Sequence, residues 1–374
     1  MNLRIAIYFG PDRIEKGGGY VQTLRTYEAL RAAGASVQLV LKEGGISTGD
    51  IAPDANMHHF IGANRAFIPL MRCIKERKLG IIALSTIFWW TPEVQRVVTP
   101  QRAVYYRYTL ARYAKRAIKK ILPRYDVYRL ADLLLPNSPG EAKLVRRHFP
   151  VSDGSIVCAV PNGADPVPES ARKLPLEPRL PPRYVLCAGS FNTRKNQLAL
   201  VRAINRTSIP LVFMGSPGLR GKSGSYDEYL LRCRAEAGPN VTFLGHAEHR
   251  SRAWYSVFAN ASAFAMPSAC ETPCLAALEA GLFGCSLALT EIGSAREYFG
   301  PYAEYCDPGD IASIRCAVER AWQAGRTQEL PKLISSKFTW SNVARMTLLA
   351  YGAAINRNGV DAFNRAATGL WFEC

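Results

Sequence analysis

Short apolar runs alternate with stretches of helical period along the whole chain, and this series occurs twice. Each run is bounded by Gly, Pro or Asn and is apolar on both faces, which is typical of parallel strands that helices cover on both sides. Two such series in 374 residues predict two doubly wound α/β domains rather than one large core. The expected strands are Arg4–Phe9, Ser36–Leu41, Gly80–Ser85, Val104–Tyr108, Leu133–Pro136 and Ile156–Val160 in the first series, and Tyr184–Ala188, Leu211–Met214, Val241–Leu244, Ala263–Met266, Ser286–Leu289 and Ala303–Cys306 in the second.

A charged stretch crowded with prolines, from Pro166 to Pro182, separates the two series and is typical of a linker between domains. We therefore expect an N-terminal domain over residues 1–168 and a C-terminal domain over residues 182–345. A final helix is expected over Ser341–Ile355. Its apolar face would consist of Val343, Ala344, Thr347, Leu348 and Tyr351.

The formal net charge is +17, and such a balance attracts nucleic acid, anionic lipid or an acidic substrate. The densest basic stretch runs from Arg102 to Arg129. Part of it, from Leu110 to Leu122, has the pattern of a basic amphipathic helix on an anionic membrane surface. A solvated helix face is the alternative interpretation. Nucleic acid is not expected as a partner, because no recognition motif accompanies the charge.

The chain begins with an expected strand and shows no leader peptide or apolar run of membrane-spanning length. We therefore expect a cytoplasmic protein with reduced cysteines, in peripheral contact with the inner face of the plasma membrane if the basic stretch binds lipid. Cys270 and Cys274 lack a second pair at zinc-binding spacing, so we assign them to packing and expect no metal.

Two carboxylates, Glu271 and Glu279, are eight residues apart around an expected helix start. Thr272 is expected to be the N-cap and Pro273 the first helical residue. A helix start presents unpaired N–H groups and the positive end of the dipole, which together bind phosphate. The pattern favours a ligand with a central diphosphate, bound by the N–H groups of Cys274 and Leu275, and with sugars at both ends, as in a nucleotide sugar.

Two further motifs contain groups that bind anions. Gly17-Gly18-Gly19 follows the first expected strand, and glycines let backbone N–H groups approach a phosphate closely, although a flexible turn is the alternative. Arg194 and Lys195 follow the strand that ends near Gly189, where two cations suit a diphosphate leaving group. An exposed basic loop is the alternative there.

Together these motifs resemble the retaining glycosyltransferase family 4, whose architecture is called GT-B. The resemblance implies two Rossmann-like domains that face each other across a cleft, with the last helices, about residues 346–374, returning onto the first domain. It also implies metal-independent transfer from a nucleoside diphosphate sugar, which is a substrate, and no cofactor. The segments that carry it, besides Glu271-x7-Glu279, are Gly17-Gly18-Gly19, Ala131-Asp132 to Asn137-Ser138, Val160-Pro161-Asn162-Gly163-Ala164-Asp165, Gly189 to Asn196, Val241 to His246, Glu291 to Glu297 and Phe338-Thr339-Trp340-Ser341.

The resemblance also implies roles for individual residues. Glu271 would contact the donor sugar and Glu279 the ribose, while Arg194 and Lys195 would stabilise the departing diphosphate. Arg194, Lys195 and Glu271 are therefore the expected catalytic residues. The expected donor-binding residues are Gly18, Gly19, Arg107, Asn162, Thr272, Pro273, Cys274, Leu275 and Glu279.

Two departures from the family pattern bear on the donor. Ser190 stands where many relatives have an arginine, and we expect Arg194 to take over that role. No histidine occurs between His59 and His148, where relatives carry one near the donor sugar, and Arg107 is expected at that place. The change fits a donor with an altered hydroxyl pattern, such as a deoxysugar.

The expected function is transfer of a hexose or deoxyhexose to a glycan or lipid-linked acceptor, in bacterial cell-envelope polysaccharide or lipopolysaccharide synthesis. A nucleotide-sugar epimerase with the same fold and a non-catalytic polyanion-binding protein are the alternatives. His246 and His249 follow an expected strand, and we assign them no chemistry.

Overall fold

The computed structural model describes residues 3–10, 17–89, 91–98, 126–149, 151–176, 180–217, 226–356 and 359–373. Contacts divide the chain into two compact units, which we call unit 1 and unit 2. Unit 1 comprises Met1–Trp89, Tyr106–Gly163 and Trp340–Trp371, and unit 2 comprises Trp90–Tyr105, Ala164–Thr339 and Phe372–Cys374. The basic stretch from 102 to 125, the expected strand Val104–Tyr108 and Arg107 lie outside the described residues.

Unit 1 is built on a six-stranded parallel sheet with the strand order β2-β1-β3-β4-β5-β6. In this order the chain moves from β1 to one neighbour and then crosses to the other, which defines a doubly wound sheet. The strands are β1 (Arg4–Phe9), β2 (Ser36–Leu41), β3 (Met57–Ile61), β4 (Ile81–Ser85), β5 (Leu133–Leu135) and β6 (Ile156–Val157).

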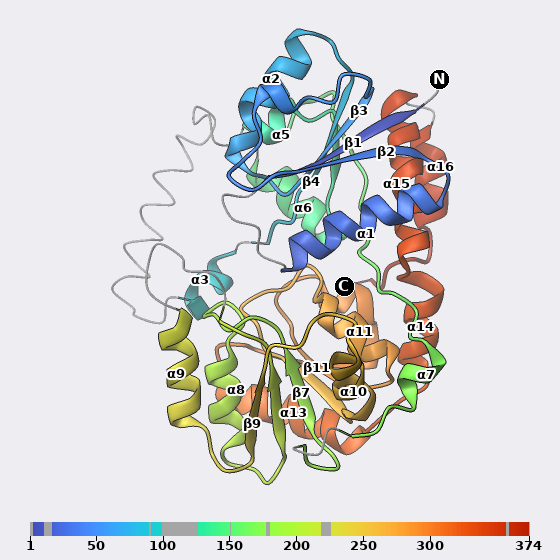
Figure 1. Cartoon of the computed structure of the whole chain (residues 1–374). Coiled ribbons are helices and arrows are strands. Elements are labelled where there is room, and N and C mark those ends of the chain that lie inside the picture. The colour runs from blue at the N-terminus through green and yellow to red at the C-terminus, as the bar shows by residue number, and fades with distance from the viewer. Residues whose placement is uncertain are drawn as a thin grey trace. The chain divides into compact units, whose positions relative to one another are not determined.

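Helices cover both faces of this sheet (Figure 1). α1 (Gly18–Ala32) and α15 (Trp340–Ile355) pack against each other on one face, and α16 (Gly359–Ala367) packs on α15. On the other face lie α2 (Ile68–Glu76), α5 (Asp126–Leu130) and α6 (Pro139–His148), whose apolar side chains share one buried core with alternate residues of β1, β3 and β4. Short 3₁₀ turns occur at Thr48–Asp50 and Arg65–Phe67.

Strand β3 was not predicted, because its sequence Met-His-His-Phe-Ile places two polar side chains inside an apolar run. The structure pairs both histidines with tyrosines in the core of unit 1. His58 Nδ1 lies 3.0 Å from the hydroxyl of Tyr8, and His59 Nδ1 lies 2.8 Å from the hydroxyl of Tyr351 on α15. Burial lowers the pKa of His59 to about 3, so this ring is neutral near pH 7.

Unit 2 is built on a second six-stranded parallel sheet, with the order β12-β11-β10-β7-β8-β9. Each of its strands ends within one residue of the predicted end. The strands are β7 (Val185–Ala188), β8 (Leu211–Met214), β9 (Val241–Gly245), β10 (Ala263–Met266), β11 (Ser286–Thr290) and β12 (Ala303–Cys306).

The helices of unit 2 also form two layers. α8 (Gln197–Ile204) packs between α9 (Tyr226–Glu236) and α13 (Ile311–Ala324), while α10 (Arg252–Asn260) packs on α7 (Glu169–Arg172) and α11 (Leu275–Leu282) on α14 (Glu329–Lys337). The remaining helices are α3 (Pro92–Val98), α12 (Ala295–Phe299) and the 3₁₀ turn Gly300–Tyr302. No helix in the described parts of either unit is both long and apolar enough to cross a bilayer.

Candidate active site in unit 2

The candidate site lies where the strand order of the second sheet reverses. From β7 the chain proceeds to β8 on one side, and later returns from β9 to β10 on the other side. The loops after β7 and β10 therefore diverge at the carboxyl edge of the sheet, which is where doubly wound folds bind ligands. Arg194 and Lys195 lie on the first loop, and Glu271 lies on the second.

The loop after β7 is fixed by backbone contacts and by Asn196. Gly189 and Gly215 have φ near 155°, and a Cβ on Gly215 would lie 2.0 Å from the carbonyl oxygen of Gly189. Asn196 adopts the left-handed conformation, and its amide Nδ2 donates to the carbonyl oxygens of Pro267 (3.0 Å) and Pro308 (2.8 Å). The Asn196 amide thus joins the Arg194-Lys195 loop to the loop after β10.

Lys195 and Glu271 form an ion pair across the reversal point. Lys195 Nζ lies 2.7 Å from Glu271 Oε1, and the Glu271 side chain is only 6% exposed. Burial by itself raises the pKa of the Glu271 carboxyl, but the charges of Lys195 and Arg194 and the hydrogen bond from Lys195 outweigh it and hold the pKa below its usual value. The carboxylate is therefore ionised near neutral pH. Arg194 remains exposed, and its Nη1 donates to the carbonyl oxygen of Cys270 over 3.4 Å.

The backbone of Glu271 is held by the loop after β11. Its N–H donates to Ile292 O (3.2 Å), and its carbonyl oxygen accepts from the N–H of Ser294 (2.9 Å). Gly293 has a φ of 125°, and a Cβ there would lie 2.1 Å from the Glu271 carbonyl oxygen. Only glycine allows this approach, so Gly293 sets the position of the carboxylate.

The helix after Glu271 begins later than predicted. Helix α11 starts at Leu275 with Cys274 as its N-cap, so the prediction that Thr272 caps the helix and that Pro273 is its first residue is wrong. The bonds between Glu271 and the loop after β11 hold the preceding segment in extended geometry, and this delays the helix. The first helical N–H groups are those of Leu275 and Ala276. Among the described residues, neither N–H group has a hydrogen-bond acceptor on the backbone.

Glu279 lies on α11, and its carboxylate is paired with a residue to which we assigned no role from the sequence. Glu279 Oε1 lies 2.6 Å from Nε2 of His249, which follows β9. The His249 ring packs edge-on against Trp254, with their centroids 5.1 Å apart. Nothing in the spacing of the sequence signals this pair, because 30 residues separate its members.

Buried thiols surround the carboxylates. Burial is the main cause that raises the pKa of Cys274 to about 12, and Glu271, Lys195 and Glu279 also act on this thiol, which therefore lies among all three charges. Burial likewise raises the pKa of Cys270 to about 11. Neither cysteine forms a disulfide within the described residues, and both are nearly inaccessible. Within the described ranges no three His, Cys, Asp or Glu side chains are grouped as metal ligands.

The other residues predicted to bind the donor belong to unit 1. Gly18 and Gly19 are the first two residues of α1, with Gly17 as the N-cap, so their N–H groups lie at a helix start. Asn162 is buried, and its amide Nδ2 donates to Gln22 Oε1 over 3.3 Å. Arg107 lies outside the described residues.

Comparisons with known proteins agree with this architecture. Residues 173–332 match the family model described as "Glycosyl transferases group 1". Sucrose-phosphate synthase from Thermosynechococcus elongatus is 18% identical, with a TM-score of 0.69 over 95% of this chain and 100% of that one. The fold is GT-B.

Two further GT-B structures are similar over nearly their whole length. HepE from Anabaena, solved in complex with UDP and glucose, is 13% identical, with a TM-score of 0.66 over 94% of this chain and 100% of that one. The apo lipopolysaccharide outer core galactosyltransferase WaaB is also 13% identical, with a TM-score of 0.63 over 95% and 100%. A search of curated proteins found no match.

Proposed function

We propose that this GT-B chain is a retaining, metal-independent glycosyltransferase of the family 4 type. It would move a hexose or deoxyhexose from a nucleoside diphosphate sugar to a glycan or lipid-linked acceptor, in the synthesis of cell-envelope polysaccharide or lipopolysaccharide. The observation that carries the proposal is the Lys195–Glu271 pair at the strand-order reversal, beside Arg194 and ahead of the start of α11.

Each group in this arrangement has a chemical task in sugar transfer. The bond between the anomeric carbon and the diphosphate oxygen breaks, and the acceptor hydroxyl oxygen bonds to the same carbon on the same face. Arg194, Lys195 and the N–H groups at the start of α11 stabilise the negative charge that develops on the diphosphate. That diphosphate takes the acceptor proton, so no side chain need act as the base. Glu271 accepts hydrogen bonds from the donor sugar, and Glu279 accepts them from the ribose.

Substitution of Lys195 tests the proposal. Lys195→Ala should lower turnover by about 100-fold or more, because it removes a charge that stabilises the leaving group. Lys42→Ala is the matched control, since Lys42 forms an exposed ion pair with Asp50 in unit 1. Unchanged turnover in Lys195→Ala would contradict the mechanism.

A second variant separates catalysis from folding. Loss of Lys195 leaves the buried carboxylate of Glu271 without its cation, which destabilises a fold. Arg194→Gln leaves Lys195 paired with Glu271, so it should lower the unfolding temperature less than Lys195→Ala does while it also lowers turnover. Circular dichroism on all variants then identifies any loss of activity that is only a loss of structure.

The donor is tested by comparing UDP-glucose, GDP-mannose and dTDP-rhamnose in a hydrolysis assay. We expect a preference for the deoxysugar, because the family histidine is missing from the sequence between His59 and His148. A clear preference for UDP-glucose would contradict this part of the proposal. Conversion of the donor sugar to its epimer, with no transfer to a glycan or lipid-linked acceptor, would favour the alternative, an epimerase. Binding of RNA or DNA with steep salt dependence, and no sugar transfer, would favour a polyanion-binding protein.

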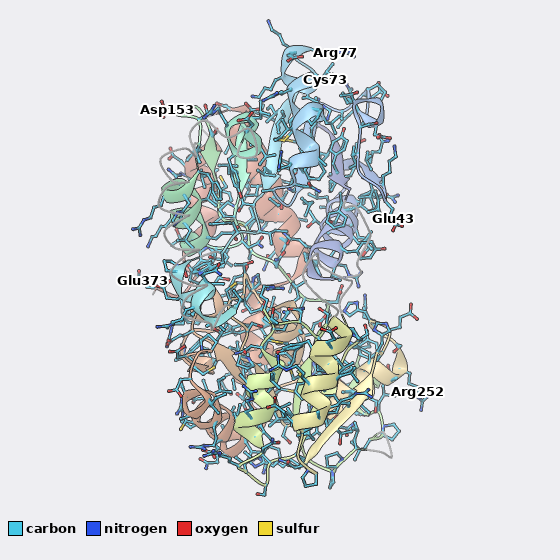
Figure 2. The ribbon with its side chains drawn as sticks, turned by 90° about the vertical axis from the view of Figure 1, so that its left-hand side faces the viewer. Glu43, Cys73, Arg77, Asp153, Arg252 and Glu373 are labelled. Atoms are coloured by element: carbon cyan, nitrogen blue, oxygen red, sulfur yellow. The ribbon has the colours of Figure 1, made fainter. Side chains whose placement is uncertain are left out.

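The proposal includes contact with an anionic membrane through residues 102–129. Described cations support it: α2, α5 and α6 share one face of unit 1, and Arg77, Arg129, Lys143 and Arg146 are exposed there, with Arg77 visible at the end of α2 (Figure 2). Glutamine at Arg112, Lys115, Arg116, Lys119 and Lys120 should abolish co-flotation with phosphatidylglycerol vesicles. Equal flotation of the unchanged protein and of this five-fold variant would contradict the membrane role.

A further inference from the structure

A second hollow in unit 2 lies at the amino edge of its sheet, away from the candidate active site. Its volume is about 140 Å³. Gly284, which precedes β11, forms part of its wall, and Thr327 and Gln328, which precede α14, form another part. Lys195 and Glu271 follow the carboxyl ends of β7 and β10 instead. The hollow is therefore separate from the site at the reversal point.

The wall of this hollow is held by Gly284. The N–H of Thr327 donates to the carbonyl oxygen of Gly284 over 2.8 Å. Gly284 has a φ of 84°, and a Cβ there would lie 2.8 Å from the carbonyl oxygen of Thr327. The close approach of these two loops places Arg326, the residue before Thr327, at the rim.

Hydrogen bonds from Nε and Nη2 hold the guanidinium of Arg326 in place. Its Nε donates to Ala261 O over 3.0 Å, and its Nη2 donates to the carbonyl oxygens of Phe258 (3.3 Å) and Ala259. These carbonyls lie at the carboxyl end of α10, where a cation is favourable. The Cys285 thiol, which donates to the carbonyl oxygens of Phe258 and Ala261, also interacts with this guanidinium. Among the described residues, no hydrogen bond from Nη1 to an oxygen acceptor is found.

Arg172, the last residue of α7, supplies a second guanidinium to the hollow. It is exposed, and the described ranges contain neither a hydrogen bond nor an ion pair for it. Its neighbour Lys173 differs, because Lys173 pairs with Glu169 over 3.3 Å. The residues that line the hollow include no carboxylate. Glu329, the first residue of α14, accepts from the hydroxyl of Thr327 and the N–H of Gln328, two of the lining residues.

Two arginines, Arg172 and Arg326, line the hollow. The bonds from Arg326 to the carboxyl end of α10 give only Arg326 a structural role. This leaves Arg172, Nη1 of Arg326 and the Gln328 amide around one hollow whose lining residues include no carboxylate. We propose that this hollow is a binding site for a small tetrahedral oxyanion, namely phosphate or the phosphate group of a small ester. Arginine binds such groups through paired N–H donors in a fixed fork.

The size of the hollow agrees with this ligand class. A water molecule occupies about 30 Å³ in the liquid, so about 140 Å³ is room for four or five atoms of that size. A phosphate group has five heavy atoms. The hollow is smaller than pockets for nucleotide-sized ligands, which typically measure about 300 Å³ or more.

The test titrates the full-length protein with inorganic phosphate and, separately, with glycerol 3-phosphate, by calorimetry with nucleoside diphosphate present to occupy the other site. Arg172→Gln should weaken binding by about tenfold, the usual effect of losing one charged hydrogen-bonding partner. Lys173→Gln is the matched control and should bind like the unchanged protein. Binding of inorganic phosphate identifies the free ion as the ligand, and binding of glycerol 3-phosphate alone identifies an ester.

Two results would overturn the proposal: no heat of binding for either compound, or equal affinity in Arg172→Gln and the unchanged protein. Affinity for nucleoside diphosphate should be the same in Arg172→Gln, which keeps this outcome distinct from any failure at the donor site. Arg326→Gln is not used as the main variant, because Arg326 also binds the end of α10.

Discussion

At the scale of single residues, the candidate site depends on a glycine, Gly293, whose backbone can approach that of Glu271 because it has no side chain. Gly293 belongs to the loop after β11 and carries none of the chemistry, yet its backbone lies against that of Glu271. The carboxylate can pair with Lys195 only while this approach is kept. Gly293 therefore positions Glu271, and a substitution there should affect activity and folding together.

Gly293→Ala should destabilise unit 2 by about 1–3 kcal/mol and lower turnover, because a Cβ would collide with the Glu271 carbonyl oxygen and φ is positive. Urea unfolding and a transfer assay measure the two effects. Gly352→Ala is the matched control: it lies within α15, a Cβ there meets nothing within 4 Å, and alanine should stabilise the helix by about 0.5–1 kcal/mol. Unchanged stability and turnover in Gly293→Ala would show that the loop after β11 can move away from Glu271 without cost.

The sequence predicted the charged residues of the site better than the residues that hold them. Lys195 and Glu271 were predicted as members of one site, and the structure brings their side chains together. The contact between His249 and Glu279 was missed because it joins a loop to a helix that lies 30 residues further along the chain. Asn196 was missed as well, since its left-handed backbone and its two carbonyl partners appear only in three dimensions.

At the scale of elements, apolar runs located nearly every strand, and the two errors have physical causes. Strand β3 was hidden by His58 and His59, whose rings are buried only because Tyr8 and Tyr351 are available as partners. The start of α11 was placed at Thr272 and Pro273 from local capping rules alone. Those rules do not include the bonds from Glu271 to a loop more than 20 residues away.

The contact between β3 and α15 leads to a prediction. Tyr351→Phe should destabilise unit 1 by about 1–3 kcal/mol, because it leaves Nδ1 of the fully buried His59 without its partner. Tyr27→Phe on α1 is the control, since the Tyr27 hydroxyl only accepts from Arg31 in an exposed hydrogen bond. Chemical unfolding followed by circular dichroism compares the two. Equal stability of both variants would mean that this hydrogen bond does not hold α15 to the sheet.

At the scale of the whole molecule, two doubly wound sheets were expected from two series of apolar runs, and both are present, although their strand orders differ. Periodicity could predict this much because every strand in a parallel sheet is buried on both faces. It could not predict which residues from distant segments join one unit. Trp340–Trp371 belongs with unit 1 by its contacts, although unit 2 lies between in sequence.

The location of the donor site can be tested across the molecule by hydrogen exchange. With UDP or GDP at about ten times its Kd, exchange should slow by about tenfold in residues 189–197 and 268–279, because binding suppresses local opening. Residues 325–328, at the amino edge of the same sheet, should exchange as before. Protection confined to unit 1 would contradict the proposed site.

The return of the chain to unit 1 has a consequence for biosynthesis. Residues 164–339 emerge from the ribosome before α15 does. Helix α15 packs Tyr351 and a row of other buried side chains against the first sheet. Unit 1 therefore cannot complete its fold until α15 has been synthesised. By then all but the last few residues of unit 2 have already been made. Proteolysis of stalled ribosomal complexes should find the second half resistant and the first half still sensitive; the opposite order would show that the first sheet matures without its last helix.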